Sequence, residues 1–315
     1  MSRLVLRRVL ATLIMLGATS VLAFAVPYLI GGDPVRSIIR ARVADQAIDP
    51  AAIEGLRLQL GLDRPLVLQY FGWFGRAVRG DFGVSFTSRL PVGRTIAAAL
   101  LISATLATSA LLVALAVALP LGTAAALRPG GTLDRFVTLL TQALVALPEY
   151  WLAPVGILIF ALYLRLLPSA GWDSLASLVL PVAVLSLRPM AYLTRVTRAS
   201  MLDVLEAPYI MAARSRGLGM GATLLRHGLR NGIMPVITLL ALWLAGLLGG
   251  SVVIEVIFAI PGMGRLLYEA VVDNDTPLLQ AGLLATVGLA VLITTAADLL
   301  YLAINPALRS SHAGR

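Results

Sequence analysis

The sequence predicts an all-α protein that crosses a membrane six times. Of its 315 residues, 59% are hydrophobic and 13% are charged, whereas soluble domains carry about 25% charged residues. The mean hydropathy is +0.90. The apolar residues also gather in blocks of about 20, the length that a ~30 Å hydrocarbon layer requires of a helix. A water-soluble fold is excluded because the chain lacks the polar residues to cover its surface.

The first apolar block runs from about Val9 to Ile30 and follows three arginines, at positions 3, 7 and 8. A secretory signal has the same order of charge and apolar chain, and Ala23–Ala25 resembles a cleavage site. Because the apolar stretch is long for such a signal, we expect a retained transmembrane helix within residues 1–32.

A mixed polar region, residues 33–94, follows this helix and is expected to form a long extracytoplasmic loop. It contains two stretches with the pattern of a short amphipathic helix, Ile53–Leu60 and Gln69–Val78. The second is rich in aromatic residues, which favour the boundary between membrane and water. We therefore expect this region to rest on the outer membrane surface.

Five further apolar blocks define a transmembrane domain over residues 95–308, before a polar tail at 309–315. Pro148 interrupts the second of these blocks, and a glycine-containing loop, Pro261–Pro277, precedes the last. A polar, arginine-rich segment at 200–232 separates the third block from the fourth. The five blocks are approximately Ala97–Ala126, Phe136–Leu164, Leu175–Leu193, Ile233–Ile257 and Leu278–Ile304.

The distribution of arginine predicts which side each loop faces. Six helices place both termini on one side, and arginines concentrate before the first helix, after the sixth and in the segments that share their side. Cytoplasmic loops carry such an excess, while long loops translocate regardless of charge. Both termini are therefore expected in the cytoplasm of a cell whose inner membrane holds the protein. The net charge of +9 is explained in this way, without nucleic-acid binding.

The segment between the fourth and fifth helices carries the most specific pattern. Ala212, Ala213 and Gly217 are small residues at helical spacing, with Arg214 and Arg216 beside them. They would clear one face of a short helix for close approach by another surface. A short helix held away from the membrane by polar chain is suited to docking a soluble partner, although a plain connecting loop with a helix-capping glycine is the alternative.

This segment resembles the cytoplasmic EAA loop of ABC-importer permeases, in which Glu-Ala-Ala is followed after three residues by Gly. Met211 stands in place of the Glu, whereas Ala212, Ala213 and Gly217 match. The resemblance extends to the DppB/OppB-type branch of the peptide/nickel importers along nearly the whole chain. Arg230 replaces the proline of the general pattern, and Asn305-Pro306-Ala307 replaces Asp-Pro-Arg. The matching phrases are Gly61–Pro65, Gly80–Gly83, Arg198–Leu202, Leu248–Ser251, Glu255–Phe258, Pro261–Gly264 and Asp298–Tyr301.

The resemblance implies a type I ABC-importer permease fold and a non-catalytic role. Such a subunit pairs with a second, homologous permease above two ATPase subunits, and an extracytoplasmic binding protein delivers di- or oligopeptides. Nickel chelates, glutathione or another small solute are alternative cargoes; a channel or carrier without ATPase partners is a third possibility. The region Ala207–Gly219 would be the coupling helix. Its expected ATPase contacts are Tyr209, Ala212, Ala213, Arg214, Gly217 and Leu218.

Pro148 and Glu149 form a second candidate site, in the translocation path. Charged groups inside a membrane usually face a bundle interior or water, and a proline kink frees backbone carbonyls there. Glu149 lies near the middle of its block. We expect it either to line the path, where it could meet a substrate amino group, or to pair with a neighbouring polar group.

No catalytic or metal-binding pattern is present. The chain has no cysteine and no lysine, so a thiolate site and a Gly-x-x-x-x-Gly-Lys phosphate loop are both excluded. The two histidines, His227 and His312, do not form a zinc motif. ATP and magnesium are therefore expected on separate ATPase subunits, with no cofactor held by this chain.

Overall fold

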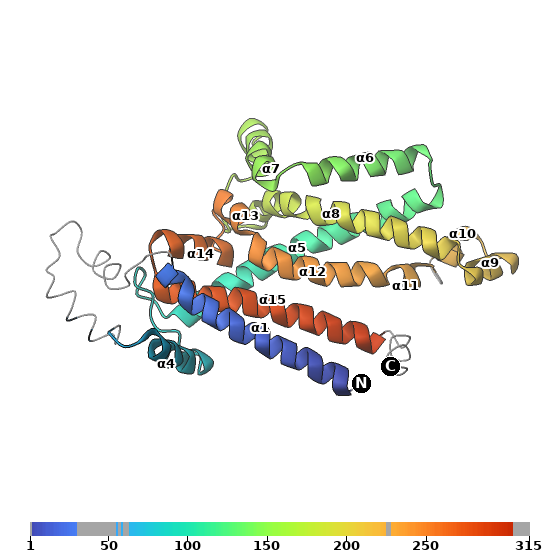
Figure 1. The fold of residues 1–315 in the computed structure, drawn as a ribbon. Helices are drawn as coiled ribbons and strands as arrows, with labels where there is room; N and C mark the ends of the chain where they lie inside the picture. Colours follow the sequence, from blue (N-terminus) through green and yellow to red (C-terminus); the bar gives the residue numbers. More distant parts are fainter. Residues whose placement is uncertain (1, 30–54, 56–57, 59–62, 225–227, 305–315) are drawn as a thin grey trace. The chain divides into compact units, whose positions relative to one another are not determined.

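The computed structural model describes residues 2–29, 55, 58, 63–224 and 228–304, which are built mainly of helices (Figure 1). In these ranges a single isolated bridge, Val84 to Pro91, is the only strand-like pairing. The predicted helix Ile53–Leu60 lies outside the described residues, apart from Gly55 and Leu58. The helices are α1 (Ser2–Leu29), α4 (Leu66–Val78), α5 (Val92–Leu127), α6 (Thr132–Ala146), α7 (Glu149–Gly156), the π-helix η1 (Ile157–Tyr163), α8 (Leu175–Leu205), α9 (Pro208–Ser215), α10 (Met220–Thr223), α11 (Leu229–Gly232), α12 (Met234–Gly250), α13 (Val252–Ile257), α14 (Met263–Val272) and α15 (Thr276–Ile304).

The chain divides into two compact units. The first comprises the described parts of 1–103, 248–252 and 261–295; the second comprises those of 104–247, 253–260 and 296–315. Helix α5 begins in the first unit and continues into the second.

In the first unit, α1 and α15 lie side by side and run antiparallel (Figure 1). The Thr12 and Thr295 hydroxyls are 2.9 Å apart, and the Gln280 amide donates to the Phe24 carbonyl at 3.1 Å. Helix α4 packs on the second half of α1 through an aromatic cluster of Phe24, Tyr70 and Trp73. The aromatic amphipathic helix predicted at 69–78 is therefore confirmed.

Helix α14 also belongs to the first unit and corrects a sequence-based expectation. The region Pro261–Pro277 was expected to be a loop, yet Met263–Val272 is helical. Its apolar side joins Met263 and Ala270 to Val92 and Ile96 of α5 and to the start of α15. The expectation was wrong because the glycines and prolines that suggested a loop lie at the borders of this short helix.

In the second unit, α8 packs against α6 and α7 and shares a core with α5 and α12. That core contains Ala114, Ala118, Leu193 and Val236. Helices α5 and α8 approach very closely at Gly122, where an added Cβ would lie 2.7 Å from the Thr194 carbonyl oxygen. Small residues permit such contacts in membrane helix pairs.

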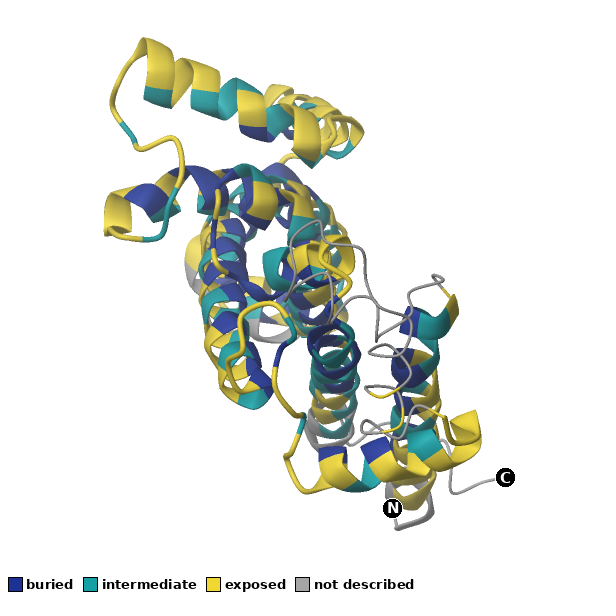
Figure 2. Ribbon diagram, turned by 90° about the vertical axis from the view of Figure 1, so that its left-hand side faces the viewer, coloured by how far each residue is buried: buried dark blue, intermediate teal, exposed yellow. Residues whose placement is uncertain are grey.

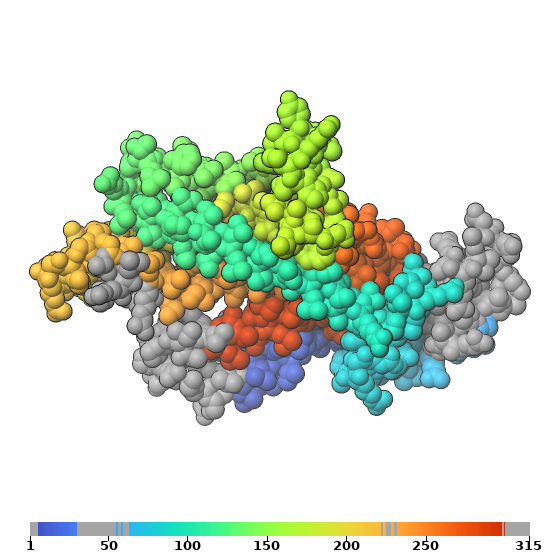
Figure 3. Space-filling view, turned by 180° about the vertical axis from the view of Figure 1, so that it is seen from behind, coloured from blue at the N-terminus to red at the C-terminus, as the bar shows by residue number. Residues whose placement is uncertain are grey.

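The block that contains Pro148 is broken. Helix α6 ends at Ala146, Leu147 and Pro148 are extended, and α7 continues through η1 at an angle of 97° to α6. The predicted interruption at Pro148 is thus confirmed. Figure 3 shows the Glu149–Tyr163 arm, in yellow-green, standing out from its neighbours; Tyr163 is 86% exposed.

The described helices fit a polytopic membrane protein. Four of them are long and apolar enough to cross a membrane, or five if the bent pair forms one span, while α12 is apolar but has only 17 residues. This count is compatible with six spans. Figure 2 shows exposed residues along much of the length of the helices. Large apolar side chains, for example those of Leu13, Leu101 and Leu139, are 59–71% exposed. Apolar exposure on this scale is characteristic of a surface that is not in water.

Several helix limits differ from those expected. Helix α5 starts at Val92 rather than near Ala97, and α8 continues to Leu205 instead of ending near Leu193. The block expected over 233–257 is divided at Ser251 into α12 and α13. Helix α8 extends because arginines that suggested a polar loop find partners on α6, as described below.

Candidate functional site

Helix α9 is the predicted coupling helix, and its ends are well defined. Pro208 occupies its first helical position, where a missing backbone N–H costs nothing. At the other end the Gly217 N–H donates to the Arg214 carbonyl at 3.0 Å, and the Leu218 N–H donates to the Ala213 carbonyl at 3.4 Å. These two bonds form a Schellman motif. The segment is therefore a short helix that begins at Pro208 and is terminated by the capping Gly217. Its role as a coupling helix, and the alternative of a connecting segment with a helix-capping glycine, both stay predictions.

The two sides of α9 differ in burial. Ile210 and Ala213 face inward and are 1% and 7% exposed. Tyr209, Met211, Ala212 and Arg214 are exposed, with Met211 at 59%. The two alanines thus serve different surfaces: Ala213 packs within the chain, and Ala212 belongs to the outward face. Sequence reasoning placed both on one cleared face because it could not tell which side the rest of the chain covers.

Gly217 has a backbone conformation that favours glycine. Its φ is +86°, and an added Cβ would meet no atom within 4 Å. The left-handed region penalises any Cβ by about 1–2 kcal/mol. Within this chain the glycine is therefore required by the turn after α9, while the space beside it is open to a partner.

Pro148 and Glu149 lie together at the break between α6 and α7. Pro148 is the N-cap of α7, and Glu149 is the first residue of that helix, where a negative charge is favourable. The carboxylate is half-buried and interacts with the charge of Arg188 on α8. Whether Glu149 lines the path or pairs with a neighbouring polar group stays a prediction. Glu149 was expected near the middle of a block interrupted at Pro148, and in the structure it is the first residue after the break.

The structure does not bring the two candidate sites together. Arg188, beside Glu149, and Leu205, the end of α8 before α9, are 17 residues apart on one helix. At 1.5 Å per residue, this separation is about 25 Å. Helix α8 therefore runs from the neighbourhood of one site to the start of the other.

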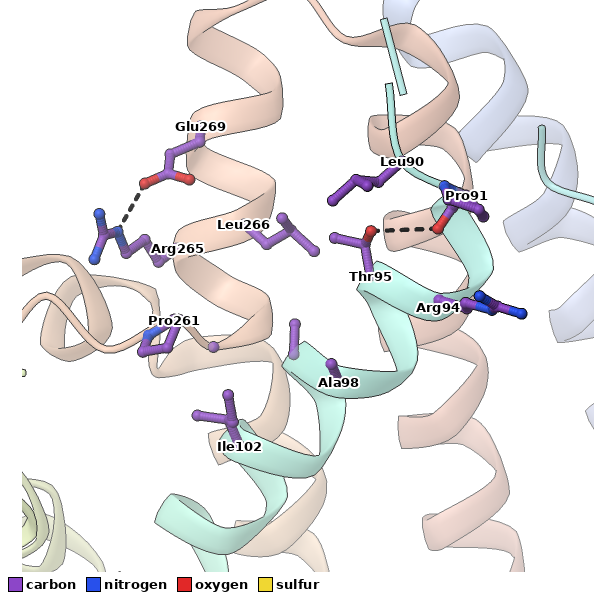
Figure 4. A pocket seen from close by; sticks show the side chains of 12 residues that line it. Leu90, Pro91, Arg94, Thr95, Ala98, Ile102, Pro261, Arg265, Leu266 and Glu269 are labelled. Carbon is purple, nitrogen blue, oxygen red and sulfur yellow. Dashed lines mark hydrogen bonds and ion pairs between the residues drawn. The ribbon is translucent and has the colours of Figure 1, made fainter. Parts of the chain in front are cut away.

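A cavity in the first unit was missed by sequence reasoning. It has a volume of about 570 Å³ and lies between the start of α5 and α14 (Figure 4). Leu266, Thr95 and Ile102 line it, and at its edge Arg265 donates to Glu269 at 2.7 Å. The pattern Met263, Leu266, Leu267, Ala270 has the spacing of an amphipathic helix and could have revealed α14. Among the described residues no group of three His, Asp or Glu side chains is placed to hold a metal.

Comparisons with known proteins agree with this architecture. Residues 118–310 match the family described as "Binding-protein-dependent transport system inner membrane component", and residues 1–108 match the N-terminal domain of such membrane components. A glutathione transport system permease protein, GsiC, from Escherichia coli is 37% identical over 97% of this chain and 98% of its own length.

Two further relatives are similar over their full length. GsiC from Shigella flexneri has the same identity and coverage as the Escherichia coli protein. A putative peptide transport system permease protein from Brucella abortus is 35% identical over 98% of this chain and 99% of its own. The resemblance drawn from the sequence is thereby confirmed: the chain belongs to the family of inner-membrane components of binding-protein-dependent transport systems, as an ABC-importer permease of the peptide/nickel group.

Proposed function

We propose that this chain forms one half of the translocation path of an ATP-driven importer of di- or oligopeptides, and that α9 couples it to a separate ATPase. The observation that carries the proposal is the outward face of α9. Tyr209, Met211 and Ala212 present apolar and small surface next to Arg214, on a helix that begins at Pro208 and ends in a Schellman motif. Protein interfaces are enriched in aromatic residues, Met and Arg, which become buried when the partner binds.

The proposed orientation places α9 and both termini in the cytoplasm. Helices α1 and α15 are antiparallel over Thr12–Phe24 and Gln280–Thr295, so the start of α1 and the later part of α15 lie at the same end of the pair. Arg214 and Arg216 on and after α9 agree with the cytoplasmic excess of basic residues.

The proposed partners are a second homologous permease, two ATPase subunits and an extracytoplasmic binding protein. The chain has no lysine to complete a phosphate loop, which is why ATP hydrolysis is assigned to other subunits. The names of the relatives favour peptides or glutathione as cargo; a nickel chelate is the alternative within the same group. An ATPase-independent channel or carrier is less well supported, because it gives the closed helix α9 and its exposed face no role.

A reconstituted complex in proteoliposomes tests the proposal, with a labelled dipeptide and labelled glutathione as probes. Ala212→Arg should abolish ATP-driven uptake while leaving the amount of protein in the membrane unchanged, because bulk on the outward face of α9 blocks docking. Ala170→Arg, an equal change at an exposed position before α8, is the matched control and should transport normally. Full uptake by Ala212→Arg would refute the docking role of α9.

The same uptake assay tests whether the break at Pro148 belongs to the translocation path. We assign Pro148 and Glu149 to the translocation path, since the break places a half-buried charge directly after the extended residues Leu147 and Pro148. Glu149→Gln should change the rate or the selectivity among peptides. Uptake identical to that of the wild type, in both rate and selectivity, would refute the assignment of Glu149 to the translocation path.

A further inference from the structure

Three side chains at the end of α8 each bind a different stretch of the second unit. The Arg195 guanidinium donates to the Thr141 carbonyl of α6 at 3.3 Å, and the Ser200 hydroxyl donates to the Gly232 carbonyl at 2.9 Å. Between them, Arg198 forms an ion pair with Asp134 at the start of α6. The end of α8 is thus tied to α6 twice and to the chain before α12 once.

The Asp134–Arg198 pair has the geometry of a fixed joint. Both Nε and Nη2 of Arg198 donate to the carboxylate, the second at 2.8 Å, and the Gly130 N–H donates to it at 2.8 Å. Asp134 is only 5% exposed. Bidentate pairs of this kind restrict relative rotation, and a buried carboxylate cannot readily give up its partners. We call this arrangement the 134–198 clamp.

Movement of α9 has a short route to the clamp. Helix α8 ends at Leu205, and the Glu206 and Ala207 N–H groups still bond back to its carbonyls, at 3.3 and 3.1 Å, before α9 starts at Pro208. Ile210 and Ala213 anchor the inward side of α9 by burial. A displacement of α9 is therefore passed to the last turns of α8, where Arg198 lies.

From the clamp, α6 leads to the break. Asp134 lies in the first turn of α6, and Ala146 ends that helix, about 18 Å further on at 1.5 Å per residue. Leu147 and Pro148 are extended and lie between α6 and α7. Residues at the end of an element are those that absorb a hinge movement.

We propose that the 134–198 clamp transmits movement of the coupling helix to α6 and thereby to the break at Pro148, making Asp134 and Arg198 positioning residues for transport. The proposal rests on the proposed function. It predicts that loss of the clamp separates ATP hydrolysis from transport, whereas a purely structural ion pair would affect both equally.

The test measures dipeptide or glutathione uptake per ATP hydrolysed in the reconstituted complex. Arg198→Gln should lower this ratio at least about tenfold while most of the ATPase activity remains, and Arg198→Lys should restore part of it. Because Arg198→Gln leaves a buried charge unpaired, the double variant Asp134→Asn with Arg198→Leu provides a neutral version that retains an acceptor for Gly130. Ser200→Ala, which removes only the bond to Gly232, is the matched control and should keep the wild-type ratio.

The outcomes separate this inference from the proposed function. A low ratio in Arg198→Gln and the neutral double variant, with a normal ratio in Ser200→Ala, supports the clamp. An unchanged ratio, or an equal loss of uptake and ATP hydrolysis, overturns the clamp and leaves the importer intact. A wild-type complex that imports neither probe upon ATP addition would instead overturn the proposed function.

Discussion

At the scale of single residues, Gly217 shows how one sequence pattern can have two physical causes. Small residues at 212, 213 and 217 suggested a cleared face. In the structure Ala213 is buried in its own chain, Ala212 faces outward, and Gly217 adopts φ +86°. Glycine two positions after a helix ends is a common terminator, so this role was open to sequence reasoning; the burial of Ala213 was not.

Replacement of Gly217 should be costly for conformational reasons alone. Gly217→Ala should destabilise the protein by about 1–2 kcal/mol, since the left-handed backbone penalises a Cβ, and Gly217→Asn should cost less because Asn tolerates this region. Gly219→Ala is the matched control: its φ is −63°, and no atom lies within 4 Å of the added Cβ. Thermal unfolding of the purified variants would measure the difference. Equal melting temperatures for Gly217→Ala and Gly219→Ala would contradict this explanation.

At the scale of elements, Asp275 determines how α15 begins. Its carboxylate accepts the Leu278 N–H at 3.2 Å, capping the helix, and also accepts the Ser85 hydroxyl and the Thr87 N–H. The side chain is 1% exposed. One residue therefore joins the start of α15 to the loop after α4, which lies about 190 positions earlier in the chain.

Loss of this joint should release the loop near Ser85. Asp275→Ala removes the cap of α15 and leaves the buried Leu278 N–H and the buried Ser85 hydroxyl without their acceptor, which should destabilise the first unit by about 2–4 kcal/mol. Asp273→Ala, a change at an exposed acid in the same turn, should have little effect. Hydrogen exchange of residues 80–91 would measure the release. The proposed joint between Asp275 and this loop would be disproved if the amides exchanged as slowly in Asp275→Ala as in Asp273→Ala.

The elements also show what the sequence could and could not predict. Apolar blocks and Pro148 predicted the long helices and the break, because both depend on local composition. The 97° bend depends on how α7 packs against α8, and no local pattern encodes that contact. Likewise, Arg195 and Arg198 suggested a polar loop; they lie inside α8 because Thr141 and Asp134, more than fifty residues earlier, satisfy them.

At the scale of the whole molecule, the account makes α8 the connection between two functions. Its later end holds the 134–198 clamp and leads into α9, and the charge of Arg188, further back on the helix, acts on Glu149 at the break. Family membership establishes a transport subunit, and the proposed coupling assigns to α8 and α6 the task of carrying force from the ATPase to the path. Because this chain contains no cysteine, a cysteine introduced for a test is the only one in this subunit.

The most direct measurement is site-specific cross-linking of α9 in the assembled complex. A benzophenone attached to Met211→Cys, on the outward face of α9, should capture an ATPase subunit. The same probe at Tyr163→Cys, which is more exposed but lies at the end of η1, should not. The account would be contradicted if the probe at position 163 captured the ATPase and the probe at position 211 did not. It would also be contradicted if the cysteine at position 211 reacted only with a thiol reagent added outside the cell.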